Sequence, residues 1–381
     1  MEQIRIKCAV LRAGTSKGIF IHENDLPADK EKRNQLILRI FGSPDIRQID
    51  GLAGAEPLAS KLAIISSASH PDADIDYTFG QVSINKPLID YSGNCGNISS
   101  GVGPFAIDEG LVKAVEPITK VRIYNTNTQK ILVAEVPVKD GKAMVTGDYK
   151  IDGVPGTGAK IMLDFAGTTG SATGKMLPTG NPIDTMDVDG LGEIEVSLVD
   201  VANPMVFVRA IDLGLTGIET PAQIDGDKRI LDILESIRAK SAVMMGVAQT
   251  EKEASEESPA FPMVAFVAPP QKYQAFATSN EIKAEEVDFV SRLMFMQVVH
   301  KTYAGTGTTC TGAAAKIPGT IVNEVSKSIS SIVRIGHPSG VIDIEVETEA
   351  DMDKVNLRRA AFGRTARRIM DGYVYVPENM V

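Results

Sequence analysis

The run Tyr91-Ser-Gly-Asn-Cys-Gly-Asn-Ile-Ser-Ser100 places Cys95 between glycines and asparagines instead of among apolar residues. Glycines on both sides allow the backbone to turn tightly and bring its N–H groups close to a ligand. Small residues follow and predict a helix over 97–109. A thiol at a helix N-terminus lies in a positive field that favours the thiolate and also holds anions. The run therefore predicts a base or nucleophile beside a carboxylate-binding site.

A second run, Gly305-Thr-Gly-Thr-Thr-Cys-Thr-Gly-Ala-Ala-Ala-Lys316, repeats this pattern with Cys310, which we expect in a loop before another helix. Residues 11–21 and 199–208 share a fainter likeness, each reading as two strands joined by a polar turn. Self-similarity at long separation indicates two related halves, and a site is expected in the cleft between them. A chain of 381 residues is also long enough for two domains.

The pattern of elements contains many strands and few helices. Strands are predicted at 3–11, 18–22, 61–66 and 76–84, and amphipathic or capped helices at 25–41 and 226–244. Because long helices do not alternate with strands, a doubly wound sheet is excluded. We expect an α+β fold of two similar domains, each a curved β sheet or barrel around a central helix that begins at a cysteine loop.

A stretch rich in Gly, Thr and Pro at 167–182 is the preferred domain boundary. It gives an N-terminal domain over 1–184 with the Cys95 loop and a C-terminal domain over 185–381 with the Cys310 loop. The packing of the C-terminal tail on the first or second domain stays open. The arginine-rich part of this tail, 356–372, is interpreted as a solvated helix face, and Cys8 as a core residue on the first strand.

Charge and composition exclude several classes of function. A net charge of −10 leaves no basic stripe to neutralise phosphates, so we expect no nucleic-acid partner. No run approaches the length of a membrane span, and the N-terminus does not read as a signal peptide, so no membrane partner is expected. Three cysteines do not make a disulfide framework. We expect a reduced cytoplasmic protein that forms a homo-oligomer.

Lysines 61 and 17 are the next candidates after Cys95. Lys61 joins a Gly-rich loop to the apolar strand Leu-Ala-Ile-Ile; burial there would lower its pKa and suit it to acid–base work, whereas an exposed lysine would be unremarkable. Lys17, in Ala13-Gly-Thr-Ser-Lys-Gly18, could bind an anion, but a plain hairpin turn explains it equally well. The spacing is not that of a phosphate P-loop.

The second half offers Cys310 and a loop with His337. A buried cysteine that only packs is the alternative for Cys310, as it is for Cys95, and a turn histidine is the alternative for His337. The four histidines show no metal-ligand spacing, and no Gly-x-Gly-x-x-Gly opens a helix after a strand. We therefore expect no metal and no cofactor.

Six motifs over nearly the whole chain resemble those of one family. The family contains 2-methylaconitate cis-trans isomerase, 4-oxalomesaconate tautomerase and 3-methylitaconate delta-isomerase. The motifs are Arg12-Ala-Gly-Thr-Ser-Lys-Gly18, Pro57-Leu-Ala-Ser-Lys61, Ser92-Gly-Asn-Cys-Gly-Asn97, the cysteine run at 307–314, Ile317-Pro-Gly-Thr320 and Gly336-His-Pro-Ser-Gly340.

The resemblance implies a diaminopimelate epimerase-like fold, which agrees with the two halves predicted above. It implies Cys95 and Lys61 as the catalytic pair, and leaves Cys310 open as a possible second acid or base. Substrate carboxylates are expected to contact residues of both halves: Ser16, Lys17, Ser60, Asn94, Gly96, Asn97, Thr311, Gly312, His337 and Ser339.

The expected activity is a cofactor-independent allylic proton shift in a small unsaturated dicarboxylate, such as 3-methylitaconate going to 2,3-dimethylmaleate. Such a carbon acid is weak, so the dienolate needs oriented donors and a cation, worth about 2–4 kcal/mol for each well-placed donor. Methylaconitate isomerisation and oxalomesaconate tautomerisation use the same chemistry and remain alternatives. An amino-acid epimerase and a non-catalytic dicarboxylate-binding protein are weaker ones.

Overall fold

The computed structural model describes residues 2–91, 93–351 and 354–378 of the chain. It forms two compact units: unit 1 is Met1–Leu163 with Arg364–Val381, and unit 2 is Asp164–Gly363. The chain passes from unit 1 to unit 2 between Leu163 and Asp164, which is earlier than the boundary predicted from the sequence between residues 184 and 185. The C-terminal tail, whose packing the sequence left open, belongs to unit 1.

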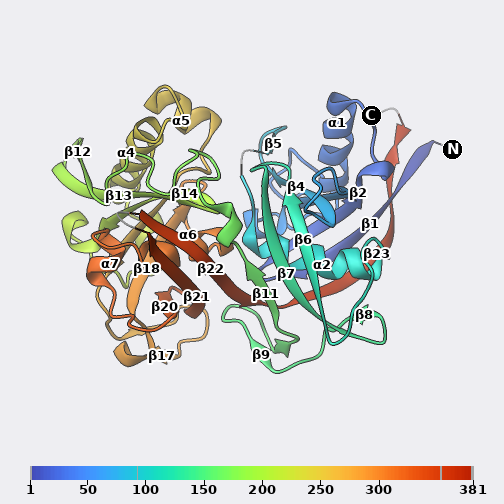
Figure 1. Ribbon diagram of the computed structural model, residues 1–381. Helices are drawn as coiled ribbons and strands as arrows, with labels where there is room; N and C mark the ends of the chain where they lie inside the picture. The colour runs from blue at the N-terminus through green and yellow to red at the C-terminus, as the bar shows by residue number, and fades with distance from the viewer. Residues whose placement is uncertain (1, 92, 352–353, 379–381) are drawn as a thin grey trace. The chain divides into compact units, whose positions relative to one another are not determined.

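Unit 1 has two described α-helices and a first set of strands (Figure 1). The helices are α1 (Lys30–Phe41) and α2 (Gly96–Asp108), with short 3-10 turns at Glu23–Asp25 and Pro57–Ala59. The strands are β1 (Gln3–Ala13), β2 (Ser16–His22), β3 (Lys61–Ser67), β4 (Ile75–Val82), β5 (Ile89–Asp90), β6 (Ile118–Asn125), β7 (Lys130–Lys139), β8 (Lys142–Ala143), β9 (Tyr149–Lys150), β10 (Thr157–Gly158), β11 (Ile161–Asp164) and β23 (Ala366–Pro377).

Unit 2 has five described α-helices and a second set of strands. The helices are α3 (Pro221–Asp225), α4 (Lys228–Met244), α5 (Glu251–Glu257), α6 (Gly305–Ala314) and α7 (Ile321–Val325), with 3-10 turns at Ala166–Thr168, Ala210–Leu213 and Ala284–Glu286. The strands are β12 (Asp184–Val188), β13 (Gly192–Val201), β14 (Asn203–Arg209), β15 (Met263–Ala268), β16 (Tyr273–Gln274), β17 (Glu281–Ile282), β18 (Phe289–Phe295), β19 (Val298–Val299), β20 (Ile332–His337), β21 (Gly340–Asp351) and β22 (Lys354–Arg364).

The two units repeat one topology. In unit 1 the strand order β1-β2-β3-β4-β6-β7 alternates antiparallel, parallel, antiparallel, parallel and antiparallel pairs. In unit 2 the order β13-β14-β15-β18-β20-β21 has the same sequence of pairings. A helix precedes the fifth strand of each set, α2 in unit 1 and α6 in unit 2. The predicted α+β fold of two similar halves is confirmed.

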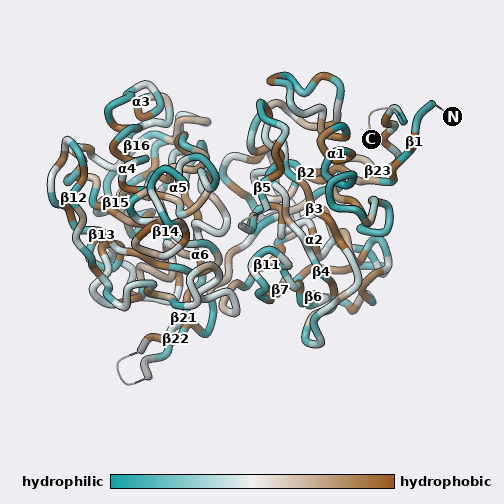
Figure 2. The backbone as a smooth tube through the Cα atoms, turned by 90° about the horizontal axis from the view of Figure 1, so that it is seen from above, coloured by the Kyte–Doolittle hydropathy of each residue, from teal (hydrophilic) through white to brown (hydrophobic). Residues whose placement is uncertain are grey.

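Each central helix is buried by the strands that curve around it. α2 contacts β1, β2, β3, β4, β6 and β7, and α6 contacts β13, β14, β20 and β21. Gly101 of α2 lies so close to the sheet that a Cβ there would be 2.8 Å from the Phe20 ring, so a small residue is required at this contact. Figure 2 shows hydrophobic colour running through the strands inside each unit, while hydrophilic colour gathers on outer loops.

Local signals predicted some element ends correctly. Gly42 ends α1 with φ of 73°, a left-handed conformation that glycine adopts easily. The predicted start at Asp25 is wrong: Glu23–Asp25 is a 3-10 turn, and α1 begins at Lys30 after Asp29, which caps it by accepting a hydrogen bond from Lys32 N. The predicted helix at 226–244 corresponds to α4, which begins after the Asp227 cap. Cys8 is buried on β1, as expected.

Two predictions about local structure are wrong. The arginine-rich segment 356–372 is not a helix; it belongs to β22 and β23, and β23 pairs with β1 along its length. The run at 305–316 is not a loop before a helix, because α6 already begins at Gly305 and Cys310 lies in its interior. In both cases tertiary pairing and packing outweigh the local pattern. No helix of the described residues is long and apolar enough to cross a membrane.

Candidate functional site

The Cys95 run forms the N-terminus of α2. Cys95 is the N-cap residue, with extended backbone, and its sulfur makes no capping hydrogen bond. Its carbonyl oxygen instead accepts from Ser99 N at 2.9 Å and from Ser99 Oγ at 3.0 Å. The side chain is half-buried. The sulfur is therefore left at the positive end of a 13-residue helix, where a thiolate and a bound anion are both favoured. Ser92 lies outside the described residues.

Lys61, the first residue of β3, is buried and contacts Cys95. Its Nζ donates a hydrogen bond of 2.7 Å to Gln81 Oε1 and lies 5.4 Å from the centre of the Phe79 ring. Burial lowers the pKa of Lys61, and its charge interaction and hydrogen bond with Cys95 oppose this shift. Lys61 and Cys95 therefore form an interacting pair of side chains, one a buried amine and the other a thiol.

Asn97 ties the first turn of α2 to the β1–β2 hairpin. Its Oδ1 accepts from Thr15 N at 3.3 Å and from Arg364 Nε at 2.9 Å, and its Nδ2 donates to Thr15 Oγ1 at 3.1 Å. Gly14 has φ of +54°, and a Cβ there would lie 2.1 Å from Asn97 Oδ1. Only glycine fits this approach, so the hairpin turn and the helix N-terminus hold each other in place.

Arg364 is a functional candidate that the sequence reasoning missed. It was grouped with a solvated arginine run, but it is buried and lies at the junction between β22 and β23. Burial lowers its pKa to about 10, and interactions with Tyr149 and Cys95 oppose the shift. A buried cation thus faces the Cys95 sulfur as Lys61 does. No local pattern in the sequence distinguishes Arg364 from the other arginines of this run.

Tyr77 of β4 completes the surroundings of Cys95. It is fully buried, and burial together with the charge of Cys95 raises the pKa of its phenol well above the ordinary value. Its hydroxyl makes no hydrogen bond of good geometry to the described residues, and Ser99 is the polar side chain that faces it. Tyr77 is thus a neutral hydroxyl next to the sulfur.

The other expected residues of the first half fall around this centre with different surroundings. Ser16 is buried, and its Oγ has no hydrogen-bond partner among the described residues, which is unusual for a buried hydroxyl. Ser60 is already satisfied, because its Oγ accepts from Gln48 and donates to Val82 O.

The last three candidates of this half are Asn94, Gly96 and Lys17. Asn94 accepts from Ser99 Oγ at 3.2 Å, and Gly96 is the first residue of α2. Lys17 is half-buried, with its ammonium beside Gly54.

The expected residues of the second half belong to unit 2 and are packed. Cys310 is fully buried in α6; its Sγ donates to Val199 O at 3.3 Å, and burial raises the pKa of the thiol. Thr311 bonds Tyr303, and Gly312 lies against Ile344. These surroundings fit a packing role for the interior of α6.

The loop after β20 is also internally bonded. His337 Nδ1 accepts from Ser339 N at 3.2 Å, and Ser339 Oγ donates to Lys301 O at 2.6 Å. In the described part of the chain, no group of three or more His, Cys, Asp or Glu side chains could hold a metal ion.

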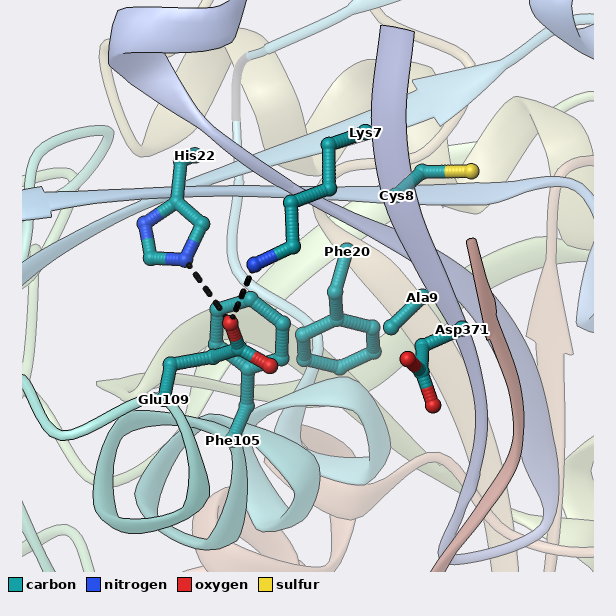
Figure 3. A pocket seen from close by; sticks show the side chains of 8 residues that line it. All are labelled: Lys7, Cys8, Ala9, Phe20, His22, Phe105, Glu109 and Asp371. Atoms are coloured by element: carbon teal, nitrogen blue, oxygen red, sulfur yellow. Dashed lines mark hydrogen bonds and ion pairs between the residues drawn. The ribbon is translucent and has the colours of Figure 1, made fainter. Parts of the chain in front are cut away.

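A small pocket of unit 1 lies at the other end of α2 (Figure 3). Glu109, the C-cap of this helix, meets Lys7 at 2.8 Å, Arg368 at 2.7 Å and His22 at 3.6 Å. Burial disfavours the carboxylate, but hydrogen bonds and charges from Lys7 and Arg368 prevail and lower the pKa of Glu109 to about 2. The anion is fully compensated, so this pocket is a structural ion cluster.

Known structures define the class of protein. A crystal structure of methylitaconate-delta-isomerase has a TM-score of 0.85 and 62% identity, covering all of this chain and 97% of that chain. A hydroxyproline epimerase from Agrobacterium vitis has a TM-score of 0.57 and 11% identity, covering 98% and 93% of the two chains, and it shows the fold alone. The protein is an isomerase with the diaminopimelate epimerase-like fold.

The chain belongs to the PrpF protein family, whose model matches residues 3–377. 3-Methylitaconate isomerase of Eubacterium barkeri is 62% identical over 98% of both chains. The 2-methyl-aconitate isomerase of Cupriavidus necator is 38% identical over 99% of this chain and 98% of its own length. The (4E)-oxalomesaconate Delta-isomerase of Novosphingobium sp. (strain KA1) is 38% identical over 97% of each.

The Glu109 cluster predicts a pH-dependent contribution to stability. The pKa of Glu109 is lowered from 4.5 to about 2 in the folded chain, so its stabilisation is present above pH 4.5 and is lost as the pH falls towards 2. Glu109→Gln should lower the melting temperature at pH 7, and the difference from the unmodified protein should shrink through this window. Glu193→Gln, at an exposed position, is the control; an equal difference at all pH values would contradict the assignment.

Proposed function

We propose that this isomerase moves a proton along the allylic system of 3-methylitaconate and releases 2,3-dimethylmaleate. The observation that carries the proposal is the contact between the buried Lys61 ammonium and Cys95 at the N-terminus of α2. The 62% identity to a 3-methylitaconate isomerase supports the choice of substrate. The pair supplies a base and an acid at one place, which an allylic shift requires.

In the proposed reaction the Cys95 thiolate removes the proton from the carbon that carries the methyl group and one carboxylate. The electrons of this C–H bond form the new double bond, and the electrons of the old one move to the terminal methylene. The charge of the dienolate is shared between this methylene and the carboxylate on the deprotonated carbon. Lys61 donates its proton to the terminal methylene, which becomes a methyl group. The Cys95 thiol then returns its proton to Lys61, so the pair is restored and no oxidant or reductant is consumed.

The lowered pKa of Lys61 suits this role, because an ammonium with a lower pKa is a stronger acid towards a carbanion. Its positive charge also stabilises the dienolate before the proton moves. Arg364 is a second buried cation that interacts with Cys95, and it favours the thiolate over the thiol.

The carboxylates of the substrate are proposed to bind around the same helix terminus. The first turn of α2 presents backbone N–H groups without side-chain caps, and such groups bind anions. The buried Ser16 hydroxyl, which no described residue engages, would donate to a carboxylate oxygen. A local cluster of donors and cations is needed because the chain carries a net charge of −10, which repels a dianion.

Replacing either member of the pair should stop the reaction. Cys95→Ser and Lys61→Ala should each lower kcat for 3-methylitaconate by about 10²–10⁴-fold, and Cys95→Ser should also abolish deuterium incorporation from D₂O. Cys8→Ala, at the buried cysteine of β1, is the matched control and should keep most activity. Near-normal rates for Cys95→Ser, or a Lys61→Ala defect confined to KM, would contradict the assigned roles.

Removing the second cation should make the sulfur less reactive. Arg364→Met should slow the alkylation of Cys95 by iodoacetamide at pH 7 by about tenfold, because the guanidinium no longer stabilises the thiolate, and should lower kcat/KM. Arg367→Met changes an exposed residue nearby in the sequence and is the control. It should change neither the alkylation rate nor kcat/KM. An unchanged alkylation rate in Arg364→Met would show that the guanidinium does not act on the sulfur.

The substrate is tested by direct comparison of acids. Followed by ultraviolet absorbance, 3-methylitaconate should be converted with a higher kcat/KM than 2-methylaconitate or 4-oxalomesaconate, whose third carboxylate would need one more cation. A preference for either tricarboxylate would transfer the assignment to the activity named for the 38% identical relatives. Binding of dicarboxylates without exchange of their C–H protons would instead favour a binding protein.

A further inference from the structure

Gln81 binds the ammonium of Lys61 and has no part in the reaction proposed above. Strands β3 and β4 are antiparallel, and Lys61 lies directly opposite Gln81 in their register. Both side chains are buried, at 3% and 4% exposure. The hydrogen bond from Lys61 Nζ to Gln81 Oε1 is 2.7 Å long. The lysine therefore has a fixed acceptor that comes from a rigid sheet.

The orientation of the Gln81 amide is determined by backbone carbonyls. Its Nε2 donates to Pro57 O and to Ser60 O, both at 3.1 Å. A reversed amide would place two N–H groups against an ammonium and an oxygen against two carbonyl oxygens, which is unfavourable on both sides. Gln81 Oε1 is thus directed at Lys61 by the chain that leads into β3.

The carbonyl that receives Gln81 is itself held in place. Ser60 is fully buried; its Oγ donates to Val82 O at 2.9 Å and accepts from Gln48 Nε2 at 2.9 Å. Val82 N in turn donates to Ser60 O at 3.1 Å. A satisfied buried network of this kind rigidifies the groups that it contains, so the acceptor for Lys61 is preorganised.

The acceptor is a neutral amide although a carboxylate would bind an ammonium more strongly. A carboxylate at this place would raise the pKa of Lys61 and compete with the Cys95 sulfur for it. The charged and titratable groups that face the pair are Arg364 at the β22–β23 junction, Tyr77 of β4 and the α2 terminus with Cys95. A neutral partner leaves Cys95 as the anion nearest to Lys61 in this set.

We propose that Gln81 is a positioning residue, which directs the Lys61 ammonium towards Cys95 without neutralising it. This inference rests on the proposed acid–base pair and goes beyond it, because Gln81 need not touch the substrate. Glutamine at this position supplies the hydrogen bond that orients the lysine, while the absence of charge keeps the lysine able to give up its proton.

The test compares two substitutions of similar size and opposite electrostatic effect. Gln81→Glu adds an anion that raises the pKa of Lys61. It should move the basic limb of the pH profile of kcat/KM to higher pH by about one unit or more. Gln81→Met removes the acceptor of a charged donor and should move the same limb to lower pH by about one unit. Both variants should lower kcat about tenfold with little change in KM, because the lysine is misplaced or less acidic.

Gln48→Met is the matched control. Gln48 is a buried amide of the same network, but it does not contact Lys61 in this network. Its Nε2 donates to Ser60 Oγ, and its Oε1 accepts from Ala55 N. Its replacement leaves Gln81 and both of its carbonyl partners in place, with Val82 N still bonded to Ser60 O. It should therefore lower the melting temperature without moving the basic limb. A shift of the basic limb in the same direction in Gln81→Glu and Gln81→Met would overturn the positioning role. A basic limb at the same pH as in the control would do so as well, and Gln81 would then be part of the packing.

A second measurement separates this inference from the choice of substrate. The alkylation rate of Cys95 by iodoacetamide at pH 7 should fall severalfold in both Gln81 variants and not in Gln48→Met, because the ammonium no longer stabilises the thiolate. This readout needs no turnover. If the unmodified protein does not convert 3-methylitaconate but the alkylation rates follow this pattern, the proposed substrate fails while the role of Gln81 stands. Unchanged alkylation in both Gln81 variants would overturn it.

Discussion

The site depends on one costly interaction, the burial of the Lys61 ammonium beside the Cys95 sulfur. A charge removed from water must be compensated by hydrogen bonds and by an opposite charge. Gln81 supplies the hydrogen bond, and Cys95 supplies the charge when it is ionised. Every nearby element contributes to this compensation: β3 and β4 set the register of lysine and glutamine, and α2 brings the sulfur with its helix terminus.

Position within a helix separates the two cysteines that look alike in the sequence. Cys95 is the N-cap of α2, so its sulfur lies at the end of the helix, half-buried and next to cations. Cys310 lies inside α6, where its sulfur donates to Val199 O and is fully buried. Equivalent helices of two related units thus hold a cysteine at the N-terminus in one and in the packed interior in the other.

The α2 helix is anchored at both ends by charges from distant strands. Arg364 and Asn97 fix its first turn to the β1–β2 hairpin, and Lys7 and Arg368 compensate Glu109 at its last turn. Between them, the close packing of Gly101 on Phe20 sets the distance from helix to sheet. The proposed reaction at this terminus would need such support, since a misplacement of about 1 Å can cost a large part of the rate.

The amino-acid sequence by itself determined the elements whose signals are local. Caps and periodicity located α1, α2 and α4, the glycine-rich context singled out Cys95, and the apolar run beginning at Lys61 indicated its burial. The tertiary structure alone decided which distant residues meet. Arg364 is 267 residues from its partner Asn97 and Gln81 is 20 from Lys61, and the arginine run and the cysteine at 310 were misplaced. Strand pairing and burial depend on contacts between remote segments, and no local pattern encodes these contacts.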